Sequence, residues 1–164
     1  MKTKTVFSIL LLLILIPAFR VSGQKDNFSG EWKLNKEKSA LTDTQLFLSK
    51  ITLQLKSDSL LTTRTYENGN GEEYPFDEKL SLDGKDCKIV VFNMPRTSKA
   101  TLSDADKSIK ITSATTFTGN NGEEDMTADE TWKLENDGQF LTLSFTNKMS
   151  GNDMTGKYYF ERVK

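Results

Sequence analysis

Histidine is absent from this 164-residue chain. Its absence excludes serine–histidine–aspartate and cysteine–histidine catalysis, as well as zinc or haem held by histidine. The only cysteine is Cys87, so no disulfide can form within the chain. A secreted domain without disulfides must obtain its stability from a packed core. We therefore expect a non-catalytic protein with no metal and no cofactor.

Long apolar runs are also scarce, and the one present lies at residues 6–19. Lys2 and Lys4 precede it, and Arg20 and the small-residue stretch 21–23 follow. The run is short for a spanning helix, which needs roughly 20 apolar residues, and the pattern is typical of a secretory signal peptide. We expect residues 1–23 to be cleaved, leaving Gln24 or a near neighbour as the new N-terminus. No cysteine follows the run to carry a lipid, so we expect a periplasmic or secreted protein.

An excess of basic residues is missing as well. Residues 1–23 hold three basic and no acidic residues, so the expected mature chain has 19 basic and 23 acidic residues, a net charge of −4. A mildly acidic chain without a basic cluster is poorly suited to nucleic acid or anionic membranes. We expect neither as a partner.

No helical period is sustained after residue 23, and short alternating runs take its place. Ten such runs are predicted to be strands: 28–34, 51–56, 60–66, 74–82, 87–93, 97–102, 109–117, 126–134, 141–147 and 154–163. Residues 24–164 are enough for one ordinary domain. The sequence thus predicts a single all-β domain.

Tight turns separate most of these runs. Asp83-Gly84 is a type I′ hairpin signal, residues 136–138 indicate a slightly longer turn, and residues 70–71 and 121–122 mark two hairpin tips. Residues 41–48 are interpreted as a short helix or a strapping loop. Short connections favour antiparallel neighbours in chain order. We therefore predict an up-and-down β-barrel of about eight to ten strands, with a two-sheet sandwich as the alternative.

The first predicted strand, FSGEWKL, places Phe28, Gly30, Trp32 and Leu34 on one face. This opening resembles that of lipocalins and fatty-acid-binding proteins, and of exported bacterial lipocalin-like domains. The resemblance implies a barrel with an internal cavity. It also implies that Trp32 closes one end beneath a basic residue of the last strand, for which Arg162 is the match. Gly30, Trp32 and Arg162 are accordingly predicted to be structural.

The last strand departs from the resemblance. Fatty-acid-binding proteins grip a carboxylate with an inward Arg-x-Tyr pair. The nearest match here is Lys157-x-Tyr159, which period-two counting places on the face opposite Tyr158 and Arg162. Fatty-acid binding by that route is not expected.

Two similar acidic segments occur in the sequence, at residues 67–84 and 118–138. Their Gly-Glu-Glu steps, at residues 71–73 and 122–124, are expected at solvated hairpin tips. Period-two counting turns Asp77 and Asp129 outward, whereas Glu78 and Glu130 share the apolar, inward register. Each copy therefore sends one glutamate into the interior.

A buried glutamate requires a partner. Arg64 is in the inward register of the preceding strand, diagonally across from Glu78, and Ser113 and Thr115 are the equivalents for Glu130. This polar group has two open interpretations, a structural polar interior or a ligand contact. Acid–base hydrolysis by the two glutamates is a third.

Two further residues lie in the strands that are predicted to form the barrel wall. Cys87 lies opposite Leu80 if the Asp83-Gly84 turn has two residues, and is predicted to be a small core residue. Pro75 removes a ladder hydrogen bond, which indicates a bulge or a loosened seam that could admit a ligand.

The function predicted is binding of a small, largely apolar molecule inside the barrel, in a cavity of a few hundred Å³. The runner-up is an interaction module with a solid core and an unidentified protein partner, favoured by the acidic tips. Trp32, Leu53 and Ile111 are predicted to contribute to the lining. The predicted ligand contacts are Arg64, Tyr66, Phe76, Glu78, Phe117, Glu130, Trp132, Phe145 and Tyr158.

Overall fold

The computed structural model describes residues 28–39, 46–119, 122–149 and 152–164. The predicted signal peptide, residues 1–23, lies outside these ranges. The described strands are β1 (Gly30–Leu34), β2 (Leu46–Leu55), β3 (Ser59–Asn68), β4 (Glu73–Ser81), β5 (Cys87–Val91), β6 (Met94–Ser103), β7 (Ser108–Gly119), β8 (Gly122–Glu135), β9 (Phe140–Met149) and β10 (Asn152–Arg162). None of the described segments is a helix long and apolar enough to cross a membrane.

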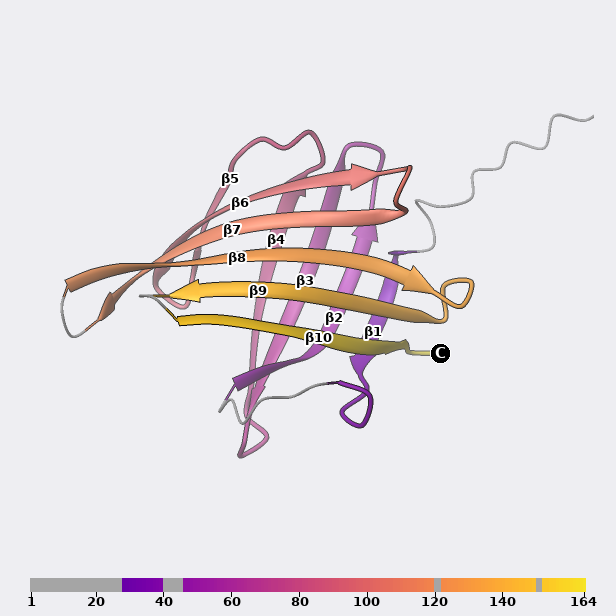
Figure 1. The fold of residues 1–164 in the computed structure, drawn as a ribbon, viewed down its shortest axis with the longest axis horizontal. Helices are drawn as coiled ribbons and strands as arrows, with labels where there is room; N and C mark the ends of the chain where they lie inside the picture. Colours follow the sequence, from indigo (N-terminus) through magenta and orange to yellow (C-terminus); the bar gives the residue numbers. More distant parts are fainter. Residues whose placement is uncertain (1–27, 40–45, 120–121, 150–151) are drawn as a thin grey trace, which may run out of the picture.

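All ten strands form one antiparallel sheet, in the order β4-β3-β2-β1-β10-β9-β8-β7-β6-β5. The first and last strands pair, with Trp32 opposite Arg162, which brings the two ends of the meander together. Strands β6–β10 run across the view in Figure 1, while β1–β4 cross behind them at a steep angle. The sheet thus folds over itself into a nearly closed barrel, and the predicted all-β up-and-down architecture is confirmed.

The barrel is incomplete between β4 and β5, which lie at opposite ends of the hydrogen-bonded order. The Asp83-Gly84 hairpin prediction was therefore wrong. Gly84 has a positive φ of 78°, but its N–H donates to the carbonyl of Ala100, and Asp83 forms a bridge with Thr101 of β6. Asp83 and Gly84 thus form a local turn, as their composition indicates. The turn places the chain beside β6 and leaves a gap in the hydrogen-bonded sheet, here called the seam, next to β4.

The segment predicted as a short helix or strap is partly strand, because β2 begins at Leu46. Residues 40–45 lie outside the described part of the chain. The pairing of β2 with β3 shifts register between Leu48 and Lys50, which marks a β-bulge at Ser49. Leu48 and Ser49 are consequently both buried. A bulge breaks period-two alternation, which explains why counting by twos did not detect this half of the strand.

One end of the barrel, here called the closed end, is sealed by Phe28, Trp32 and Arg162. The Arg162 guanidinium lies 4.2 Å from the centre of the Trp32 ring, as the resemblance implied. Its Nη1 donates to the Ser29 carbonyl at 2.7 Å, and the Trp32 indole N–H donates to the Phe28 carbonyl at 3.0 Å. Gly30, with φ of 143°, leaves the space that Arg162 occupies, since a Cβ there would overlap Nη1.

The core extends from the closed end along the inward face of the strands. Trp32, Ile51, Leu60, Leu80 and Trp132 are among its fully buried members. Cys87 is half-buried at the core margin, and its thiol donates to the Lys79 carbonyl at 2.7 Å. Pro75 is exposed on β4, which borders the seam, a position where a missing N–H is tolerated.

Candidate functional site

The end of the barrel opposite Trp32 is here called the mouth. A cavity of about 110 Å³ lies there, and Tyr66, Phe145 and Tyr158 contribute aromatic walls to it. Arg96 and Glu130 place charged groups on the same cavity. The remaining lining residues are Leu46, Leu48, Met126, Ala128, Leu143, Asn147 and Met154. The mouth is therefore a mainly apolar recess with two charged side chains.

Glu130 of β8 is held by partners from two strands. Its Oε1 accepts a hydrogen bond from Arg64 Nη1 at 2.7 Å, and its Oε2 accepts one from the Trp132 indole N–H at 2.8 Å. Arg64 is completely buried, and its guanidinium lies 4.9 Å from the centre of the Trp132 ring. A buried carboxylate needs this kind of compensation. Glu130 and Arg64 thus connect opposite walls of the barrel.

Glu78 of β4 has a different partner. Its Oε1 accepts from Arg96 Nε at 3.4 Å, and Arg96 Nη1 lies 3.3 Å from Thr115 Oγ1. The predicted pair between Arg64 and Glu78 is present but long, at 3.9 Å between Nη2 and Oε2. Arg64, Glu78, Arg96 and Glu130 form a continuous group, here called the charge cluster.

Arg96 was missed by the sequence reasoning, which began the strand at residue 97. The inward register of β6 contains the buried residues Ser98 and Ala100. Counting back by twos from these residues reaches Arg96, so the alternation that located Glu78 and Glu130 held the necessary signal.

Electrostatics keep Arg64 and Glu130 ionised and the nearby tyrosines neutral. Burial opposes the charge of Glu130, but the guanidinium of Arg64 outweighs it and holds the pKa of Glu130 below its ordinary value. Burial alone would lower the pKa of Arg64, yet Glu130 raises that pKa above its usual range. Burial raises the pKa of Tyr66 and of Tyr158. At neutral pH the mouth therefore presents an ionised Glu130 carboxylate and intact phenols.

Aromatic side chains surround the two arginines on the β3–β4 side. Phe76 stacks on Tyr66 with ring centres 6.1 Å apart, and the guanidinium groups of Arg64 and Arg96 lie 6.0 and 5.9 Å from the Phe76 ring. Phe92, from the turn between β5 and β6, packs in T-shaped geometry against Phe76, with ring centres 5.9 Å apart. These contacts fix the rim where the seam reaches the mouth.

The structure brings most of the predicted ligand residues together. Tyr66, Glu130, Phe145 and Tyr158 line the mouth cavity. Arg64, Phe76, Glu78 and Trp132 contact one another or these residues. Leu53, Ile111 and Trp32 belong to the buried core.

Phe117 is the exception among the predicted contacts. It pairs with Glu124 in the β7–β8 hairpin, which projects beyond the rest of the barrel in Figure 1. Its side chain is half-buried and lines no part of the described mouth cavity. Glu123 and Glu124 lie at the start of β8, at the tip of the same hairpin, where Glu123 is exposed and Glu124 is half-buried.

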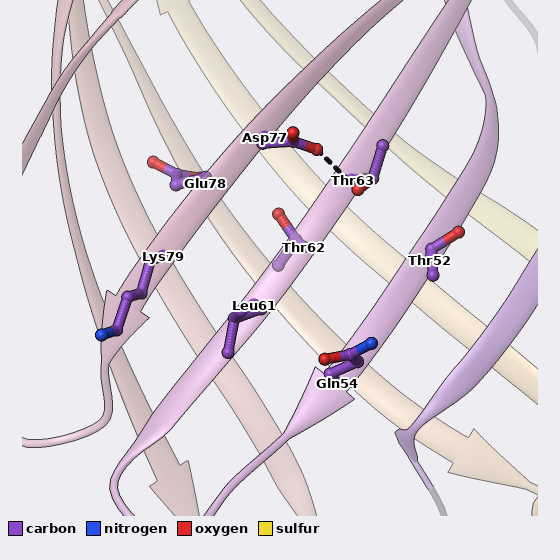
Figure 2. A pocket seen from close by; sticks show the side chains of 8 residues that line it. All are labelled: Thr52, Gln54, Leu61, Thr62, Thr63, Asp77, Glu78 and Lys79. Carbon is purple, nitrogen blue, oxygen red and sulfur yellow. Dashed lines mark hydrogen bonds between the residues drawn. The ribbon is translucent and has the colours of Figure 1, made fainter.

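A second recess, of about 430 Å³, lies over β2, β3 and β4 (Figure 2). Its residues are Thr52, Gln54, Leu61, Thr62, Thr63, Asp77, Glu78 and Lys79. Asp77 accepts a hydrogen bond from the Thr63 hydroxyl at 2.6 Å, so this carboxylate faces outward as predicted. The recess has no aromatic wall, and Gln54, Asp77 and Lys79 are exposed. It is better described as a polar outer surface than as a ligand cavity.

Fold and site together define a class: an antiparallel barrel with one sealed end and a charged, partly aromatic mouth. This architecture is compatible with the calycin-type barrels that the FSGEWKL strand resembles. No family model matches the chain, and no curated protein matches it.

Proposed function

We propose that the protein is a lipocalin-like carrier that binds a small, largely apolar molecule at the mouth. The observation that carries the proposal is the mouth cavity itself, with aromatic walls and a convergent pair of charged groups, Arg96 and Glu130. Apolar concavities with a few well-placed polar groups are the usual form of small-molecule sites.

The size of the cavity limits what enters it. About 110 Å³ is well below the few hundred Å³ that the sequence predicted, and a dry cavity of about 150 Å³ accommodates benzene. We infer that one end of the ligand occupies the cavity while the rest extends past Leu46, Met126 and Met154. Methionine side chains adapt readily to such a neighbour.

Ligand binding can be tested with N-phenyl-1-naphthylamine, an uncharged dye whose emission rises in apolar surroundings. We expect saturable binding to the native protein. Ala128 is 8% exposed and lines the cavity, so Ala128→Phe fills the space and should weaken binding at least tenfold. The matched control is Ala114→Phe, since Ala114 lies on the outer face among Thr97, Thr112 and Thr127.

Dye binding by the native protein and the two variants distinguishes three outcomes. Loss of dye binding in Ala128→Phe with retention in Ala114→Phe supports the mouth as the binding site. Equal binding by both variants would place the dye elsewhere, and no saturable binding by the native protein would contradict the proposal.

Export is part of the same proposal. It rests on residues 1–23, which have the basic start, apolar run and small residues of a signal peptide. Expression with these residues in a bacterium should yield a processed protein. Its intact mass should correspond to a chain that begins at Gln24. Retention of the unprocessed chain in the cytoplasm would contradict export.

A solid interaction module remains the second candidate, because the cavity is small and apolar side chains are exposed around it. Leu46, Tyr74, Phe92 and Met149 are each 38–45% exposed, and exposed apolar groups at one end favour a protein contact. Absence of dye binding together with stable capture of a purified partner would favour this candidate.

Hydrolysis by Glu78 and Glu130 is the third and weakest hypothesis. A glycosidase acid requires a raised pKa, whereas Arg64 holds the pKa of Glu130 below its ordinary value. Both carboxylates are also engaged by arginines. The test is whether Glu78→Gln or Glu130→Gln abolishes a turnover while the domain stays folded.

A further inference from the structure

The charge cluster is electrically balanced. Among the residues that the structure describes, the buried charged side chains are Arg64, Glu78, Arg96 and Glu130, each 9% exposed or less. Two guanidinium groups and two carboxylates sum to no net charge. Each carboxylate lies within 4 Å of a guanidinium: Glu130 beside Arg64, and Glu78 beside both arginines.

Hydrogen bonding inside the cluster is less complete than its charge balance. Arg64 Nε and Nη2 are buried donors without an acceptor in hydrogen-bonding geometry, and Glu78 Oε2 is a buried acceptor without a donor. The neighbouring Thr62 hydroxyl, opposite Glu78 in the β3–β4 ladder, is also buried without a hydrogen-bond partner. Buried polar groups are normally satisfied. The cluster thus has unused donors on Arg64 and an unused acceptor on Glu78, directly behind the Arg96 and Glu130 side chains that line the cavity.

The cluster also forms the polar part of the mouth. Arg96 and Glu130 line the cavity directly, and Arg64 and Glu78 are their ion-pair partners. The polar end of a bound molecule would therefore meet a site of zero net charge. A carboxylate there would add an uncompensated buried negative charge, and an ammonium group an uncompensated positive one. Both are costly in a poorly hydrated interior.

We propose that the mouth selects ligands whose inserted end is uncharged and both donates and accepts a hydrogen bond, as a primary amide or an alcohol does. This selection rests on the proposed function. It separates this barrel from one that grips a carboxylate through an unbalanced arginine.

The proposal is tested by calorimetric titration with three compounds that share a six-carbon chain: hexanamide, hexanoate and hexylammonium. Native protein should bind hexanamide at least about tenfold more tightly than either ion, because only the ions bring an unpaired charge into the site. Hexanoate or hexylammonium binding as tightly as hexanamide would overturn the proposal.

Two substitutions should shift the preference in opposite directions. Glu78→Gln leaves the cluster with one excess positive charge, so hexanoate should gain about tenfold relative to hexanamide. Arg96→Gln leaves one excess negative charge, so hexylammonium should gain instead. Because the two shifts are opposite in sign, a general loosening of the barrel cannot produce both.

The outer face supplies matched controls. Asp77→Asn and Lys79→Gln change the net charge of the whole chain as Glu78→Gln and Arg96→Gln do, but both side chains are exposed on β4. They should leave the ranking of the three compounds unchanged. A ranking that follows the charge of the whole chain would overturn the proposal.

Failure of the selection rule differs from failure of the proposed function. Dye binding that depends on Ala128 would support the proposed carrier function. Tight hexanoate binding by native protein in the same experiments would contradict the selection for uncharged ligands. Absence of binding by the dye and by all three compounds discards both. If Glu78→Gln does not fold, Arg96→Gln and the native ranking still decide the rule.

Discussion

Arg64 is the residue on which the interior depends most. It is completely buried and lies between the carboxylates of Glu130, at 2.7 Å, and Glu78, at 3.9 Å. A buried ion pair often contributes little net stability compared with apolar side chains, but removal of one partner leaves the other charged and unpaired. The cost of a substitution here therefore depends on which partner remains.

This reasoning predicts strong coupling between Arg64 and Glu130. Arg64→Met should lower the free energy of unfolding by about 3–5 kcal/mol, and the double variant Arg64→Met/Glu130→Met should recover more than half of that loss. Urea unfolding measures both. Lys99→Met is the control, since its ion pair with Asp86 is exposed and should contribute less than about 1 kcal/mol. Additive losses in the double variant would contradict the coupling.

The lowered pKa of Glu130 predicts how the stability of the protein depends on pH. This pKa is lowered in the folded state, so the stability that Glu130 contributes is present above the ordinary glutamate pKa of about 4.3 and is lost as the pH falls through the lowered value. Arg64, Arg96 and Glu78 face it within the cluster. Between about pH 7 and pH 3, native protein should lose more unfolding free energy than Glu130→Gln does. Parallel stability curves would show that the carboxylate is not stabilised as described.

Sequence alternation identified the inward glutamates, but it assigned the partners incompletely. Counting by twos places Glu78, Glu130 and Arg64 on one face, since that depends only on local strand geometry. It cannot show that Arg64 of β3 reaches Glu130 of β8, because these strands are not neighbours in the sheet. That contact depends on how closely opposite walls approach when the barrel closes.

The turn between β5 and β6 is the element with the least typical sequence. Phe92 and Asn93 both have positive φ, 50° and 65°, as a type I′ turn requires. A bulky side chain is rare in that conformation. The Phe92 ring compensates by reaching across the seam, where it packs in T-shaped geometry against Phe76 and Tyr74, with ring centres 5.9 and 6.3 Å apart.

We predict that Phe92 fastens the β5–β6 hairpin to β4. Phe92→Asn relieves about 1 kcal/mol of backbone strain but removes two aromatic contacts of about 0.5–1.5 kcal/mol each, so the hairpin should be held less firmly. Hydrogen exchange of the β5 and β6 amides should accelerate, while exchange in β9 should not change. Unchanged exchange in β5 and β6 would show that the seam is held by other contacts.

At this scale the sequence predicts strands better than the connections between them. Apolar alternation located all ten strands, because each has one buried face. Asp83-Gly84 has the composition of a hairpin turn but joins strands that do not pair, whereas Phe92-Asn93 is a hairpin turn without the usual composition. Whether two strands pair across a turn depends on the curvature of the whole sheet, to which turn residues respond only locally.

The whole molecule is a barrel with two unlike ends. At the closed end Trp32, Phe28 and Arg162 fill the interior and join the first strand to the last. At the mouth the packing gives way to a cavity of about 110 Å³ with charged and aromatic walls. The sequence predicted the barrel and most of the mouth residues. It overestimated the cavity, because the volume left inside depends on how the side chains interdigitate.

Methyl resonances of methionine test the central claim, that the mouth binds a small molecule, most directly. Met126 and Met154 line the cavity, and selective ¹³C labelling would report on both. Titration with N-phenyl-1-naphthylamine should shift these two resonances along a single saturable curve, and Ala128→Phe should abolish the shifts. Saturable dye binding that leaves both methyl resonances unmoved, or no binding at all, would contradict the account.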